Sequence, residues 1–189
     1  MLRPALNQHD PGGRRMIRLP DGVVSDAEFS EDQRFRQKLM RDWTAEGQES
    51  RTILWIGMNP STANIDFNDP SCHREFLFSR QWGYTRYLKG NILDYRATRP
   101  RDIPGNLGAA RTPRNLEAIT EMADDAECVV IAHGNMLKRY QPAIDDVLRA
   151  VAQNGVPMFC LGQTGKGFPR HVLPVPADVH LQRLAILEA

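Results

Sequence analysis

Four short runs of apolar residues divide the chain, and each is bounded by polar or turn-forming residues. They cover residues 52–58, 84–93, 128–132 and 158–161. Their length fits strands. Three of them contain few polar positions, which is typical of strands that are buried on both faces, while the run over residues 84–93 mixes apolar residues with Thr85, Arg86, Lys89 and Asn91. The pattern therefore predicts four interior strands of one sheet.

The segments between these runs carry helix signals. Asp69-Pro70 is typical of a helix start, because Asp caps the helix and Pro is tolerated at its first position. Thr112-Pro113 opens a second helix, which extends to about residue 125. A third helix is predicted over residues 136–153, with a disturbance at Pro142.

Strands that alternate with helices are joined by crossovers, which make the strands parallel and place helices on both faces of the sheet. The predicted fold class is therefore α/β: a small three-layer αβα domain with a four-stranded, mainly parallel sheet and an N-terminal β extension. In such sheets, ligands bind beyond the carboxyl ends of the strands.

The two ends of the chain give weaker patterns. Residues 1–13 are predicted to be a loose arm, and residues 14–24 resemble two edge strands joined by a turn. Residues 27–43 fit a helix or a strand, and we favour a strand after a turn at residues 30–32. We expect residues 1–26 to form the arm and short strands, and residues 27–189 a single α/β domain that ends in a helix over 177–187.

The composition is that of an ordinary globular protein, with 189 residues of which 41% are hydrophobic and 25% charged. No apolar run is long enough to span a bilayer, and the N-terminus lacks the apolar segment of a secretory signal. Cys72, Cys128 and Cys160 form no C-x-x-C pair, so neither a disulfide framework nor a zinc site is indicated. We expect a cytoplasmic protein that has no membrane partner and uses neither a metal nor a cofactor.

Basic residues are concentrated between Arg86 and Arg114, although the net charge is only +1. This segment holds seven basic residues and two acidic ones. Arginine binds phosphate and stacks on bases, so the segment would suit DNA or a nucleotide as a partner. A solvated surface is the alternative.

The loop that follows the first apolar run is a candidate binding site. Gly57 permits a close approach of the backbone, and Pro60 stiffens the turn. Asn59, Ser61 and Thr62 then offer hydrogen-bonding groups from this loop. An ordinary Asx-type turn after a strand is the alternative explanation.

Polar residues at the other strand ends would reach the same edge of the sheet. Asn91 lies near the end of the second run, and the loop after the fourth run carries Gly167, Arg170 and His171. The N–H groups of a glycine-rich loop can surround an anion, while a flexible connection is the alternative. His133 follows the third run, and for it we favour capping or packing over catalysis.

Cys72 and the nearby aromatic residues have simple structural explanations. Cys72 would lie near a helix N-terminus and could form a thiol dyad with His73 or His171. Burial in the core is the more common state of a lone cysteine, and we favour it. The aromatic residues of the first predicted helix also suit the core.

Several of these motifs together resemble an uncharacterised bacterial family, the domain of unknown function numbered sixteen forty-three. The resemblance covers the chain from about Phe35 onward and names no activity. It is carried by Gly57-Met58-Asn59-Pro60-Ser61-Thr62-Ala63, Asn68-Asp69-Pro70-Ser71, Trp82-Gly83-Tyr84, Asn91 and Leu161-Gly162-x-Thr164-x-x-Gly167-x-Pro169-x-His171.

A more remote resemblance, to the uracil-DNA glycosylase superfamily, implies a chemistry. This resemblance is carried by three features: a strand followed by G-x-N-P, an asparagine at the end of the next strand, and a histidine in a late loop. It implies that Asn59 positions an attacking water, that Asn91 reads the edge of a flipped base and that His171 supports the departing base. Phe76 or Phe67 would stack on that base. Other expected substrate-binding residues are Gly57, Pro60, Ser61, Thr62, Gly167 and Arg170.

The chain departs from that superfamily at two points. The late loop reads His171-Val172-Leu173-Pro174 in place of H-P-S, so the serine that grips the DNA backbone is missing. Asn59 cannot accept a proton, so Asp66 or Asp69 would have to act as the base. Two functions stay open: a nucleobase-recognising protein with glycosylase-like activity, and a binder of, or enzyme acting on, a free nucleotide or another small anion.

Overall fold

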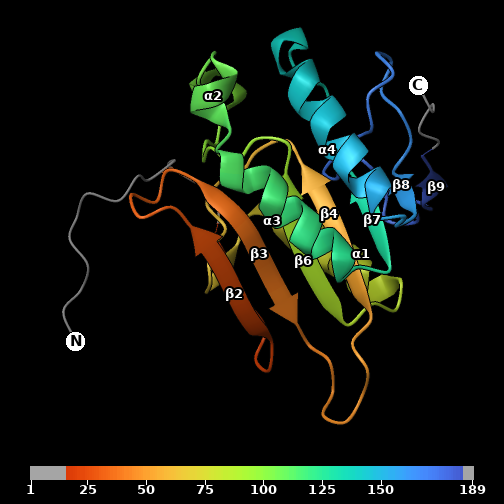
Figure 1. Cartoon of the computed structure of the whole chain (residues 1–189). Coiled ribbons are helices and arrows are strands. Elements are labelled where there is room, and N and C mark those ends of the chain that lie inside the picture. Colours follow the sequence, from red (N-terminus) through yellow and green to blue (C-terminus); the bar gives the residue numbers. More distant parts are fainter. Residues whose placement is uncertain (1–15, 185–189) are drawn as a thin grey trace.

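A seven-stranded mixed sheet is the centre of the fold (Figure 1). The computed structural model describes residues 16–184. The strand order is β2-β3-β6-β4-β7-β8-β9. The strands are β2 (Val24–Phe29), β3 (Arg36–Asp42), β4 (Thr52–Gly57), β6 (Arg86–Asn91), β7 (Cys128–Ile131), β8 (Met158–Cys160) and β9 (Gln182–Arg183).

The four predicted interior strands form the middle of this sheet. β4 pairs in parallel with β6 on one side and with β7 on the other, and β7 pairs in parallel with β8. The predicted four-stranded sheet is nevertheless too small. β2 and β3 extend one edge as an antiparallel hairpin and β9 extends the other edge, because residues 24–42 and 182–183 supply short, less apolar strands.

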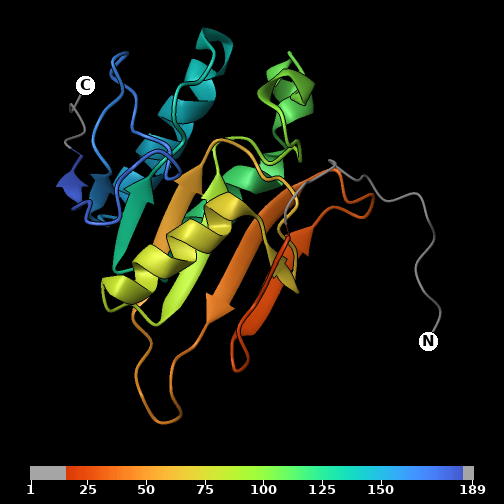
Figure 2. The same ribbon diagram turned by 180° about the vertical axis from the view of Figure 1, so that it is seen from behind.

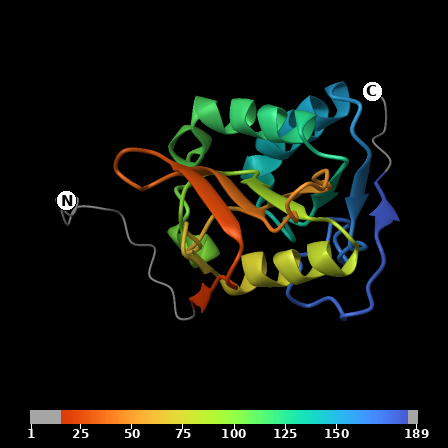
Figure 3. The ribbon, with the colours of Figure 1, turned by 90° about the horizontal axis from the view of Figure 1, so that it is seen from below.

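Helices cover both faces of the sheet. α1 (Pro70–Gln81) lies on one face, and α3 (Pro113–Asp124) and α4 (Gln141–Gln153) lie on the other (Figures 2 and 3). Asp69 caps α1 by accepting a hydrogen bond from the Cys72 N–H, as predicted from the Asp-Pro pair. The other helices are short: the α-helix α2 (Leu107–Ala110) and the 3-10 helices η1 (Pro100–Asp102) and η2 (Lys138–Tyr140).

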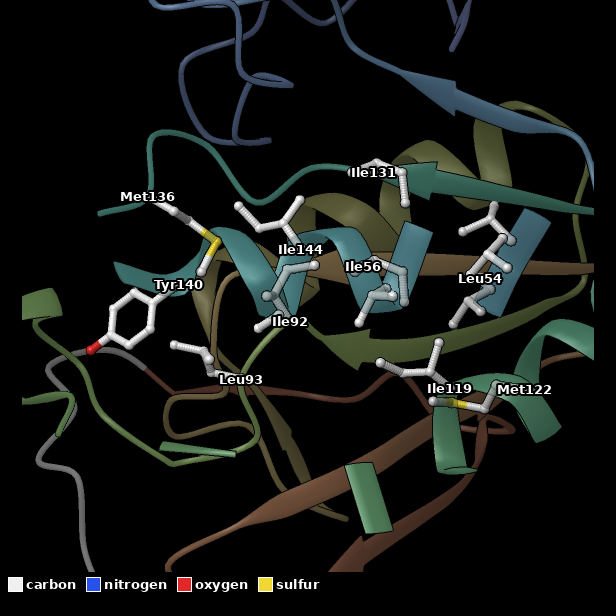
Figure 4. Close-up of a cluster of buried hydrophobic side chains, with 14 of the residues drawn as sticks. Leu54, Ile56, Ile92, Leu93, Ile119, Met122, Ile131, Met136, Tyr140 and Ile144 are labelled. Carbon is white, nitrogen blue, oxygen red and sulfur yellow. The ribbon is translucent and has the colours of Figure 1, made fainter. Parts of the chain in front are cut away.

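The alternation of side chains along β4 divides the core into two parts. Leu54 and Ile56 pack beneath α3 and α4, in the cluster shown in Figure 4. Ile53 and Trp55 point to the opposite face and join a second cluster, which includes Phe78 of α1. All four β4 side chains are fully buried, and each such burial stabilises the fold by about 1.5–3 kcal/mol. β4 is thereby held rigidly from both sides.

The turn predicted between two edge strands within residues 14–24 is present in the described part, at residues 21–22, but the two strands belong to different sheets. β1 (Ile17–Arg18) pairs with β5 (Phe67–Asn68) in a separate two-stranded sheet. β2 begins only at Val24 and uses its backbone groups to pair with β3. The expected boundary after residue 26 falls within β2, and the predicted arm over 1–13 lies outside the described residues. The strand favoured within residues 27–43 is present as β3.

Two predicted helices need correction. α4 begins at Gln141 and not at residue 136, because Pro142 is tolerated only in the first turn, where its missing N–H has no partner to lose. The helix predicted over 177–187 is absent from its described part, residues 177–184. Residues 182–183 form β9 there, since the open edge of β8 offers backbone partners.

Candidate functional site

A cavity of about 430 Å³ opens at the carboxyl ends of β4, β6 and β7, next to the N-terminus of α1. We call it the strand-end pocket. Its wall includes residues from six separate parts of the chain, among them Gly57, Asn59, Lys89, Asn91, His133 and His171. The position agrees with the rule that open α/β sheets bind ligands at this edge.

Gly57 is required by the packing of the pocket floor. It lies opposite Asn91 in the parallel β4–β6 ladder. A Cβ atom at Gly57 would lie 2.6 Å from the Lys89 Nζ and 2.9 Å from the Asn91 Oδ1. The two β6 side chains therefore occupy the space above β4 that any larger residue would fill.

Lys89 is held beneath the pocket by a buried acid. Its Nζ lies 2.7 Å from the Glu75 Oε1 of α1, and the two side chains are only 5% and 1% exposed. The second oxygen, Glu75 Oε2, accepts a 2.8 Å hydrogen bond from the Tyr87 hydroxyl. Burial raises the pKa of Tyr87, so this hydroxyl stays protonated and keeps donating. The network fixes the ammonium group at the pocket wall.

Asn91 lines the pocket and has a fully buried carboxamide. The residue is 1% exposed, and neither its Nδ2 nor its Oδ1 has a hydrogen-bond partner within residues 16–184. Arg36, also 1% exposed and part of the pocket wall, has an Nε without a partner in the same range. Buried polar groups are nearly always paired, so these atoms mark a place where a bound molecule can supply the missing hydrogen bonds.

Asn59 lies in the pocket wall with its amide nitrogen already engaged. Nδ2 donates to the Ala97 carbonyl at 2.7 Å and to the Pro60 carbonyl at 2.9 Å. Ser61 contacts Thr98 through the two hydroxyls, 3.1 Å apart. The Asn59 side chain therefore joins the loops that follow β4 and β6 and has a fixed orientation.

Two histidines line the pocket in different tautomers. The His133 Nδ1 lies 2.7 Å from the Gly134 carbonyl, which can only accept, so this nitrogen carries the hydrogen. The Leu173 N–H donates to the His171 Nδ1 at 3.3 Å, so a neutral His171 carries its hydrogen on Nε2, which lies 3.4 Å from the Ser71 Oγ. Burial lowers the pKa of both rings and favours their neutral forms.

The N-terminus of α1 brings a carboxylate to the same wall. The Asp69 Oδ1 accepts a 2.9 Å hydrogen bond from the Cys72 N–H, and Asp69 lines the pocket, whereas Asp66 does not. Burial, with the Asp69 charge as a smaller cause, raises the pKa of Cys72 to about 12. The thiol is therefore protonated at neutral pH, which argues against the thiol dyad.

The pocket includes only part of the predicted site. Gly57, Asn59, Ser61, Asn91 and His171 line it. Five other residues lie elsewhere: Pro60 and Thr62 are buried in the loop, Phe76 packs on Trp43 with ring centroids 4.8 Å apart, and Gly167 and Arg170 are exposed on the late loop.

Lys89 and Arg36 are pocket residues that the sequence patterns did not indicate. Lys89 gave a detectable signal, a cation inside an otherwise buried strand. Arg36 gave none, because it begins a run of three polar residues, Arg36-Gln37-Lys38, which is typical of an exposed segment.

Most of the basic segment is neutralised by carboxylates. Five of its seven residues form ion pairs within 4 Å: Arg86 with Asp42, Lys89 with Glu75, Arg99 with Asp102, Arg111 with Asp146, and Arg114 with Glu28 and Glu121. Across residues 16–184, no group of three or more His, Cys, Asp or Glu side chains is placed to hold a metal ion. In the same part of the chain, no helix is long and apolar enough to cross a membrane.

The sheet and the pocket define an α/β protein with a cavity at the carboxyl ends of its parallel strands. The chain belongs to the family described as a protein of unknown function (DUF1643), which matches residues 36–173. This match confirms the family predicted from the sequence, and it contains every residue that lines the pocket. Neither the curated proteins nor the solved structures gave a match.

Proposed function

We propose that the strand-end pocket binds a nucleobase, carried by a free nucleoside or nucleotide. The observation that carries this proposal is the Asn91 carboxamide, which is buried in the pocket wall with both polar atoms unpartnered among residues 16–184. A carboxamide offers a donor next to an acceptor, and many bases present the complementary pair along one edge. Such a ligand would satisfy both atoms at once.

The size and charge of the site support a small ligand. A volume of about 430 Å³ lies within the usual range for pockets that bind small molecules. Arg36 adds a positive charge to the wall, whereas the charge of Lys89 is balanced by Glu75; the Arg36 guanidinium suits a base carbonyl oxygen or a phosphate. The ion pairs of the basic segment leave fewer cations for a DNA backbone, so a free nucleotide is the better candidate.

The test is a thermal-shift panel of nucleobases, nucleosides and nucleotides, followed by calorimetry on any that stabilise the protein. Asn91→Ala should weaken binding about 10- to 100-fold, the value of one bidentate contact. Asn154→Ala, which removes hydrogen bonds to α3 far from the pocket, is the control and should bind normally.

Asn91→Leu gives a second, independent readout. It removes an unpartnered buried carboxamide, so it should abolish binding and yet raise the free energy of unfolding by about 1–3 kcal/mol. If no nucleobase, nucleoside or nucleotide binds the parent protein, the proposed function is wrong.

Cleavage of an N-glycosidic bond is the second candidate, and it extends the remote similarity to the uracil-DNA glycosylase superfamily. The observation that favours it is that Asn59, Asp69 and His171 line one pocket. Asp69 would accept a proton from the attacking water, Asn59 would orient that water, and the His171 Nε2–H would stabilise the departing base.

The assay for this activity uses single- and double-stranded DNA that contains uracil or a deaminated purine. Abasic product from the parent protein, reduced at least 100-fold by Asp69→Asn and by His171→Ala, would support it. No abasic product on any of these substrates would exclude it and leave the binding function standing.

A further inference from the structure

His133 lies at the end of β7 with one ring nitrogen used and the other unused. The residue is 1% exposed and lines the strand-end pocket. Its Nδ1 hydrogen is directed to the Gly134 carbonyl, 2.7 Å away, while Nε2 is buried without a partner among residues 16–184. The ring edge packs on Phe168 with centroids 5.9 Å apart, which holds the imidazole in place.

The hydrogen bond to Gly134 determines what the free nitrogen can do. A carbonyl oxygen only accepts, so Nδ1 must carry the hydrogen, and a neutral imidazole then has a lone pair on Nε2. Burial lowers the pKa of His133, which keeps the ring neutral near pH 7. His133, a residue of the pocket wall, thus has a buried acceptor that no protein group within residues 16–184 uses.

The neighbouring histidine, His171, has the opposite hydrogen-bonding role at its Nε2. A Cβ on Gly134 would lie 3.2 Å from the His171 Cβ, so the two histidines flank the same backbone turn. Because the His171 Nδ1 accepts from the Leu173 N–H, its Nε2 is a donor. The pocket therefore combines one imidazole acceptor, one imidazole donor and the two-sided Asn91 carboxamide.

We infer that His133 is a specificity-determining residue whose Nε2 accepts a hydrogen bond from an N–H group of the bound base. This inference rests on the proposed function and narrows it: the ligand is a base with at least one N–H donor beyond the edge that Asn91 reads. As free bases, uracil and xanthine have several N–H donors, and xanthine attached to a sugar through N9 keeps two, whereas the fully N-methylated bases have none.

The experiment compares two substitutions that separate the two ring nitrogens. In His133→Asn the side-chain amide can replace Nδ1 and keep the Gly134 contact, but nothing replaces Nε2. In His133→Gln the side-chain oxygen can reach the Nε2 position and accept. The probes are uracil with 1,3-dimethyluracil and xanthine with 1,3,7-trimethylxanthine, measured by calorimetry at pH 7.5.

We expect uracil or xanthine to bind the parent protein at least about 10-fold more tightly than its methylated form. His133→Asn should lose about 10-fold in affinity for that base, and His133→Gln should stay within about 3-fold of the parent. Nitrogen-15 NMR of the parent protein supplies a measurement that needs no variant: the His133 Nε2 should be unprotonated without ligand, and its signal should shift when the base is added.

Three results would overturn the inference. If a base binds the parent protein and His133→Asn equally well, His133 is only structural, and the nucleobase function survives. A protonated His133 Nε2 in the ligand-free protein would also remove the acceptor. If neither these bases nor any member of the wider panel binds the parent protein, the proposed function itself fails, and the inference fails with it.

Discussion

Breaking the Lys89–Glu75 ion pair should cost a large part of the stability of the fold. The two charged groups are 2.7 Å apart and at most 5% exposed, so removing either one leaves an uncompensated buried charge. Such a loss costs about 3–5 kcal/mol. The free energy of unfolding of a typical domain is only about 5–15 kcal/mol, so the variants Lys89→Met and Glu75→Leu should each be severely destabilised.

The double variant should recover most of this loss, since it has no buried charge. It leaves the Tyr87 hydroxyl without its acceptor, which costs about 1 kcal/mol and is offset in part by the new apolar packing. The expected coupling energy between the two positions is therefore about 3 kcal/mol or more.

Urea unfolding, followed through tryptophan fluorescence, measures these differences. Trp55 is fully buried and stacks on Trp82, so its emission should report loss of the core. With a slope of about 1–3 kcal/mol per molar urea, each single variant should lower the midpoint by more than about 1 M. Lys38→Met is the control, because its ion pair with Glu121 is partly exposed and contributes less than about 1 kcal/mol.

Two results would refute this reasoning. One is a single variant at Lys89 or Glu75 that loses no more stability than Lys38→Met. The other is a double variant that is as unstable as the sum of the two single ones, which would mean that the charges do not interact. If the single variants fail to fold, recovery of a folded double variant tests the same point.

Three further predictions follow from the pocket. Gly57→Ala should lower the free energy of unfolding by about 1–3 kcal/mol through overpacking, as measured by urea unfolding. Gly165→Ala is the control and should lower it little, because a Cβ there meets no atom within 4 Å, and equal losses would contradict the packing argument. Cys72 should resist iodoacetamide at pH 8 in the native protein and react once urea unfolds it, as mapped by mass spectrometry; rapid native labelling would contradict a protonated, buried thiol. Burial lowers the pKa of His133 and of His171 below the usual 6.5, so on acidification the unfolded chain binds more protons than the folded protein. The free energy of unfolding should therefore fall as the pH drops from 7 through the pKa values of these histidines. In a variant with both histidines replaced by Gln, the urea midpoint should fall less over the same pH change.

Local signals were sufficient to predict the centre of the fold. The four runs became the four parallel strands, and in β4, β7 and β8 the continuous hydrophobicity reflects burial on both faces. The Asp69 cap and the position of α1 also followed from neighbouring residues. Asn59, Asn91 and His171 could be placed at one edge, because parallel strands end on the same side.

Features that depend on distant partners could not be predicted in this way. β9 is only two residues long, and it is a strand because β8 has an open edge. Lys89 is tolerated in a buried strand because Glu75 approaches from α1. His133 gave the signal of a packing residue, and only the fold shows that its Nε2 lacks a partner within the described chain.

The hydrogen bonds that join the strand-end loops have a consequence for the cost of binding. Asn59 donates to the Ala97 carbonyl, the Ala97 N–H donates to the Pro60 carbonyl at 2.9 Å, and the Ile92 N–H donates to the Gly57 carbonyl at 2.9 Å. These contacts order the pocket wall during folding, so a ligand would lose little affinity to the conformational entropy of loop closure. Association should then be a single step whose rate rises linearly with ligand concentration and does not level off at a slow rearrangement.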